Sequence, residues 1–105
     1  MDKIPVKIHR LLKKYLEELE KNNVPIRQAI LFGSHAMDSS NEWSDIDIAL
    51  ISDLFEGIRI KDKDKIRRIT LSVSSSLEIL PFRPDDFSSE NPLAKEIIET
   101  GIRLV

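Results

Sequence analysis

The sequence predicts an α/β (α+β) fold, in which a small mixed sheet of three to four strands is flanked by helices. Two observations predict this fold. One is an apolar stripe at helical spacing near the N-terminus, and the other is a series of compact apolar runs bounded by Pro and Gly. The chain has 105 residues, of which 41% are hydrophobic and 32% charged, a composition typical of a folded protein. This length suits a single domain over residues 1–105.

The first predicted element is an amphipathic helix between Pro5 and Asn22. Its apolar side chains recur at intervals of three and four residues: Ile8, Leu11, Leu12, Tyr15, Leu16 and Leu19. Pro5 suits the first turn of this helix, while Asn22 and Pro25 indicate its end. A compact apolar run over residues 26–32 follows and predicts a buried strand.

A second strand is predicted over residues 45–51, and a third over 77–82, ended by its prolines. The segment between them predicts a helix over 62–75, whose inward side chains are Ile66, Ile69 and Val73. Because such a helical crossover is right-handed, the second and third strands should be parallel and adjacent or nearly so.

The chain is expected to close with a helix and a short edge strand. The helix begins near Pro92 and stops at Gly101, and its inward side chains are expected to be Leu93, Ile97 and Ile98. Residues 102–105 then form the edge strand.

Charge and cysteine content exclude several classes of protein. The 16 Lys and Arg residues against 18 Asp and Glu residues give a net charge of −2, which argues against direct nucleic-acid binding. With no cysteine, the chain has neither disulfides nor thiolate metal sites. No apolar run is long enough to span a membrane, and no signal peptide is evident. We therefore expect a cytoplasmic protein without a membrane partner.

Candidate chemistry lies at the start of the second strand. Asp45 and Asp47 alternate along a strand, so they share a face with Cα atoms about 6.5–7 Å apart. Such a pair can hold a divalent cation, although a solvated strand start is the more frequent explanation of this pattern. Gly33 and Ser34 end the preceding strand, where backbone N–H groups could bind a phosphate or simply form a turn. Together the two motifs are what phosphoryl or nucleotidyl transfer needs.

The segment LFGSHAMDSSNEWSDIDIALIS, residues 31–52, resembles the signature of the minimal nucleotidyltransferases, a branch of the DNA polymerase β-like superfamily. In that family an apolar strand, Gly-Ser, a short helix, a loop and Ser-Asp-Ile-Asp follow one another. The resemblance implies the nucleotidyltransferase (polymerase β palm-like) fold for the whole chain.

The resemblance also implies roles for individual residues. The nucleotide's phosphates would be held by Gly33 and Ser34, with Ser44 also on the nucleotide side, and two Mg²⁺ ions would be held by Asp45 and Asp47. A third carboxylate sits at the start of the next strand in the family, and Glu78 occupies a suitable place for it as metal ligand and catalytic residue. An exposed residue without a role is the alternative for Glu78.

The most favoured function is transfer of AMP from ATP to a hydroxyl of a partner protein. The resemblance implies that this partner is a small helical protein of the HEPN type, a toxin that the chain would neutralise as antitoxin. The alternative is a catalytically silent module that acts by contact alone, which Met37 and Asp38 favour because many family members have a basic residue and Gly there. A drug-modifying half-site is a weaker third hypothesis, and the choice between homo- and hetero-oligomer stays open.

Three further features are given structural interpretations. We expect His35 to face solvent rather than phosphate. Trp43 could stack on a base or anchor its loop on the core. The basic segment 59–68 carries six Lys and Arg residues against two Asp residues and is expected to be a solvated helix face.

Overall fold

The computed structural model describes residues 4–36 and 45–105, and it contains a four-stranded mixed sheet in the order β3-β2-β1-β4. The strands are β1 (Gln28–Phe32), β2 (Ile46–Ile51), β3 (Leu77–Phe82) and β4 (Ile102–Arg103). The helices are α1 (Val6–Lys21), α2 (Arg59–Val73) and α3 (Pro92–Thr100), with short 3-10 turns η1 (Gly33–His35) and η2 (Pro84–Asp86). The predicted α+β fold is therefore confirmed.

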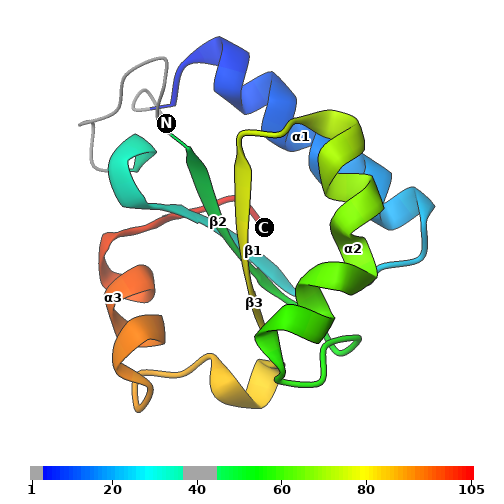
Figure 1. Cartoon of the computed structure of the whole chain (residues 1–105). Coiled ribbons are helices and arrows are strands. Elements are labelled where there is room, and N and C mark those ends of the chain that lie inside the picture. The colour runs from blue at the N-terminus through cyan, green and yellow to red at the C-terminus, as the bar shows by residue number, and fades with distance from the viewer. Residues whose placement is uncertain (1–3, 37–44) are drawn as a thin grey trace.

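The sheet lies between two layers of helices (Figure 1). Helices α1 and α2 cover one face and α3 covers the other. Residues of β2 alternate between the two cores: Ile48 packs with α1 and α2, while Ala49 packs with α3. Within the described part of the chain, no helix combines the length and the apolar character that crossing a membrane requires.

Strand pairing brings the predicted site residues to one end of the sheet. Strand β2 runs antiparallel to β1, with Phe32 opposite Asp47. It runs parallel to β3, with Asp47 opposite Glu78, so the predicted crossover through α2 is confirmed. The end of β1 and the starts of β2 and β3 consequently meet.

Several predicted boundaries differ from the structure, among them the starts of α2 and β1. Helix α2 starts at Arg59 rather than Asp62, because Asp62 does not begin the helix but anchors the loop before it. Its fully buried carboxylate accepts hydrogen bonds from the N–H groups of Glu56 at 2.8 Å and Gly57 at 2.9 Å. Strand β1 starts at Gln28, two residues later than the apolar run.

The inward face of α3 is narrower than the sequence analysis expected. Ala94 and Ile97 are buried against the sheet, but Leu93 and Ile98 are 37% and 47% exposed, so the expectation for these two was wrong. The reason is geometric: a nine-residue helix capped by Asn91 presents few turns to the sheet, and its contact stripe is filled by Ala94 and Ile97.

Candidate active site

The candidate site is built where β1 ends and β2 begins. Antiparallel pairing sets Phe32 opposite Asp47, and the chain then turns through Gly33 into η1. Gly33 has a φ of +75°, a left-handed conformation that side chains disfavour. A Cβ atom at this position would collide with the Asp47 carboxylate. Two features therefore favour glycine at position 33: the positive φ of its backbone and the Asp47 carboxylate that lies against it.

Asp45 and Asp47 flank the first residue of β2. Asp45 is exposed and directly precedes the strand, whereas Asp47 is half-buried within it. Burial raises the pKa of Asp47, and the negative charges of Asp45 and Glu78 raise it further, while His35 acts in the opposite direction. The carboxylates of Asp45 and Glu78 are thus each close enough to Asp47 to repel its negative charge.

Glu78 is the nearest carboxylate on the neighbouring strand, but it is engaged elsewhere. Its Oε2 atom accepts a hydrogen bond from Lys63 Nζ of α2 at 3.1 Å. Lys63 is the residue at the site that the sequence analysis did not single out. Its signal was present in the basic segment 59–68, but only the packing of α2 against β3 places that segment beside Glu78.

His35 does not face solvent as expected. It lies in η1 with only 6% of its surface exposed, because the turn after Gly33 folds it back over the start of β2. Ser34 is half-buried in the same turn. The predictions for Met37, Asp38, Trp43 and Ser44 lie outside the described residues.

The donor set of this site fits a magnesium ion. Carboxylate oxygens are the ligands that Mg²⁺ prefers, and a divalent cation would relieve the repulsion at Asp47. In the described ranges 4–36 and 45–105, no group of three or more Asp, Glu, His or Cys side chains is gathered to hold a metal. Asp45 and Asp47 stay the predicted metal-binding pair, and Glu78 lies on the neighbouring strand, where it is bonded to Lys63.

Comparison with known proteins assigns the fold. The chain is similar to the crystal structure of a candidate nucleotidyltransferase from Sulfolobus solfataricus, with a TM-score of 0.65 over 93% of this chain and 79% of that one, at 15% sequence identity. No curated protein matches the sequence. Residues 12–105 match the family described as "Polymerase beta, Nucleotidyltransferase". The paired aspartates beside Gly33 thus occur in a chain that belongs to the polymerase β-like nucleotidyltransferase family.

Proposed function

We propose that this protein transfers AMP from ATP to a hydroxyl group of a partner protein. The observation that carries the proposal is the contact between Gly33 and the Asp47 carboxylate. This contact supports the proposal because it puts the turn that would bind phosphate next to the acidic pair. A nucleotide held at that turn would have its phosphates next to the two aspartates.

The proposal gives separate roles to the two aspartates and to the turn at Gly33 and Ser34. Asp45 and Asp47 would hold magnesium, which when bound supplies positive charge to the phosphates and makes the acceptor hydroxyl easier to deprotonate. Gly33 allows the backbone to approach the phosphates because it has no side chain. Ser34 follows it in the same turn and would bind on the phosphate side.

At the α-phosphorus the reaction forms one P–O bond and breaks another. The acceptor oxygen bonds to the α-phosphorus of ATP, the bond from that phosphorus to the bridging oxygen breaks, and pyrophosphate leaves. The hydroxyl proton would pass to the carboxylate of Glu78, which lies opposite Asp47 in the sheet register. Glu78 must part from Lys63 to accept it, and this exposed ion pair is weak enough to open.

The proposed acceptor is a protein, and the partner suggested by the sequence resemblance is a HEPN-type helical toxin. Modification of this toxin would make the chain its antitoxin. The alternative is a silent module that neutralises the partner by contact, with the acidic pair unused.

The test uses ATP labelled at the α-phosphate and the product of the neighbouring reading frame as acceptor. We expect label on the acceptor and release of pyrophosphate, both dependent on Mg²⁺. Asp45→Asn/Asp47→Asn should abolish both, and Glu78→Gln should reduce transfer by about 10²-fold while ATP affinity stays within a few-fold.

The same assay with ATP labelled at the γ-phosphate is the control. Label from the γ-position would indicate a kinase and contradict the proposal. Complete absence of label from the α-position, with the acceptor bound and inhibited, would favour the silent module instead.

A further inference from the structure

Strand β3 has a free edge. It is the terminal strand of the described sheet, paired only with β2. The N–H of Ile46 donates to the Ser76 carbonyl at 2.8 Å, and the N–H of Ser52 donates to the Phe82 carbonyl at 3.2 Å. Because backbone groups alternate in direction along a strand, those of Leu77 and Ile79 point away from β2. They are therefore available to pair with another strand.

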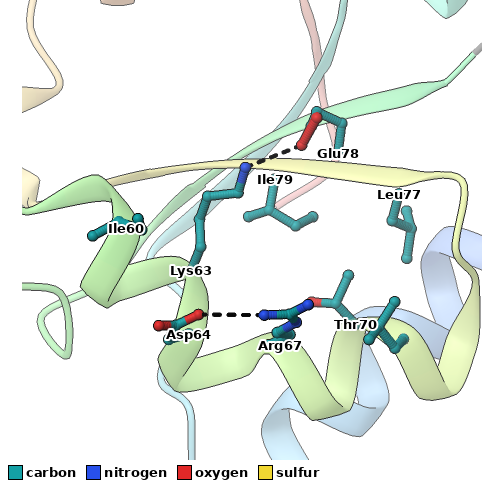
Figure 2. A pocket seen from close by; sticks show the side chains of 9 residues that line it. Ile60, Lys63, Asp64, Arg67, Thr70, Leu77, Glu78 and Ile79 are labelled. Atoms are coloured by element: carbon teal, nitrogen blue, oxygen red, sulfur yellow. Dashed lines mark hydrogen bonds and ion pairs between the residues drawn. The ribbon is translucent and has the colours of Figure 1, made fainter.

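A groove of about 350 Å³ runs between this edge and α2. Its walls include Ile60 and Leu71, which are 72% and 56% exposed on α2, facing Leu77 and Ile79 of β3. Figure 2 shows the side chains of Leu77 and Ile79 on one side of β3 and the Glu78 carboxylate on the other. The groove and the candidate active site thus share the strand but lie on opposite faces of it.

An added strand would reach both faces at once. Its side chains would alternate, so a residue opposite Glu78 would point to the face that carries Asp47. The residues immediately before and after it would point into the groove, on the side of β3 that carries Leu77 and Ile79. Strand addition of this kind draws affinity from the main chain and specificity from alternate side chains.

We propose that the free edge of β3 binds an extended segment of the acceptor protein, with the reacting hydroxyl opposite Glu78 and an apolar residue on each side of it in the groove. This inference rests on the proposed function, because the reacting hydroxyl has meaning only for a transferase. It adds the substrate class: an extended, acidic segment with an apolar–hydroxyl–apolar pattern.

The positive charge of residues 59–68 favours an acidic segment as the binding partner. Lys63 and Arg67 line the groove together with Asp64 and Glu78, with which they form ion pairs. The positive surplus belongs to segment 59–68 as a whole, which carries six cations against two aspartates. Lys63 reaches past the edge of β3 to Glu78, and the two side chains are 41% and 54% exposed (Figure 2). An acidic residue of the incoming segment would pair with Lys63 and release Glu78 toward the acceptor hydroxyl.

The same charges disfavour a second copy of this chain as the occupant. Pairing of β3 with β3 would bring two such basic helices against each other, and their repulsion would oppose the new strand contacts. An acidic acceptor segment removes this repulsion and uses the same backbone groups.

The test records ¹⁵N amide signals of the full chain with a synthetic peptide, without ATP or metal. The probe is acetyl-Asp-Glu-Val-Tyr-Val-Glu-Asp-amide, and its control is the same peptide with N-methyl groups on the three central residues. We expect the unmodified peptide to shift the amide signals of Leu77 and Ile79, and the N-methylated peptide to leave them unchanged, because it cannot pair as a strand.

A pair of matched variants tests the groove. Ile60→Ser/Leu71→Ser should weaken peptide binding about tenfold, because it removes apolar contact area. Val6→Ser/Ile98→Ser removes two apolar side chains of comparable exposure elsewhere on the surface and should not change binding.

Three results would each overturn the docking proposal: equal binding of both peptides, shifts confined to other strands, or a dimer formed through β3.

The proposed function is tested separately. If the peptide binds at β3 but its tyrosine receives no label from α-labelled ATP and Mg²⁺, the edge is a docking site and transfer to that hydroxyl is wrong. A peptide with Phe in place of Tyr should bind equally and accept no label.

Discussion

At the residue scale, a substitution at Gly33 should affect both the stability of the protein and the proposed binding of ATP. Gly33→Ala forces a side chain into a φ of +75° and against the Asp47 carboxylate. We expect it to destabilise the protein by about 1–2 kcal/mol through backbone strain. It should also abolish binding of ATP with Mg²⁺, because Asp47 is displaced.

Gly57→Ala is the matched control for this change. Gly57 also has a positive φ, of +93°, but its Cβ would meet the Arg83 side chain, at 3.0 Å from Nε. We expect a similar loss in the free energy of unfolding and unchanged ATP affinity by calorimetry. If both variants bind ATP equally well, the turn at Gly33 is not part of a nucleotide site.

Asp47 gives a prediction about pH. Its pKa is raised above the unfolded value of 3.8 by burial and by Asp45 and Glu78. Above pH 3.8 the native state therefore holds more protons than the unfolded state, and stability falls as pH rises through the folded pKa. Asp47→Asn should then raise the melting temperature of the metal-free protein at pH 7, and the difference should vanish below pH 3.8.

Thermal unfolding in the presence of EDTA measures this effect. Asp64→Asn, a change at an exposed residue of α2 that is 66% accessible, serves as control and should leave the melting temperature unchanged. Added Mg²⁺ should stabilise the wild type and not Asp47→Asn. A melting temperature of Asp47→Asn equal to or below that of wild type at pH 7 would contradict the proposed repulsion.

At the scale of elements, a buried side-chain hydrogen bond connects α1 to α2. The Tyr15 hydroxyl lies 2.7 Å from Thr70 Oγ1, which itself donates to the Ile66 carbonyl at 3.0 Å, so Tyr15 is the donor. Burial raises the pKa of Tyr15 to about 12. Tyr15→Phe leaves the Thr70 oxygen one donor short and should cost about 1 kcal/mol.

Urea unfolding of Tyr15→Phe measures this cost. Ser72→Ala removes an exposed hydroxyl of α2 that bonds only within its own helix, and should change stability by less than about 0.5 kcal/mol. The wild type should also lose stability between pH 10 and about 12, where Tyr15 ionises only in the unfolded state. Persistence of that loss in Tyr15→Phe would assign it to another group.

Element types were predictable because apolar periodicity differs between helices and strands. Their ends were less so, as α2 shows: Asp62 looked like a helix start, but its carboxylate holds the preceding loop and the helix begins at Arg59. The burial of His35 and the exposure of Ile98 depend on how a turn and a short helix meet the sheet. Neither is visible in local sequence spacing.

The candidate site was predictable to the extent that motif and register determine it. Gly33, Asp45 and Asp47 follow from the motif, and the place of Glu78 follows from the parallel crossover. The partnership of Lys63 with Glu78 could not be predicted, because it depends on the separation of α2 from the edge of β3. Whether Glu78 is free to act with the two aspartates therefore depends on packing that the motif does not encode.

At the scale of the whole molecule, the sheet order β3-β2-β1-β4 explains why so small a chain can carry this site. Gly33 directly follows β1 and Asp47 lies within β2, and helices cover both faces of the sheet around these central strands. Strand β3 contributes Glu78 and keeps one edge open. The proposed nucleotide side, at Gly33 and Asp47, and the proposed acceptor side, at the edge of β3, would thereby lie at one end of the sheet.

The central claim is that Asp45 and Asp47 hold a metal ion together with a nucleoside triphosphate next to Gly33. Calorimetric titration of the protein with ATP, with and without Mg²⁺, tests it most directly. We predict binding that requires Mg²⁺, is lost in Asp45→Asn/Asp47→Asn and is retained in the control Asp64→Asn. Binding of equal strength in the double variant, or no binding by the wild type at millimolar ATP and Mg²⁺, would contradict the account.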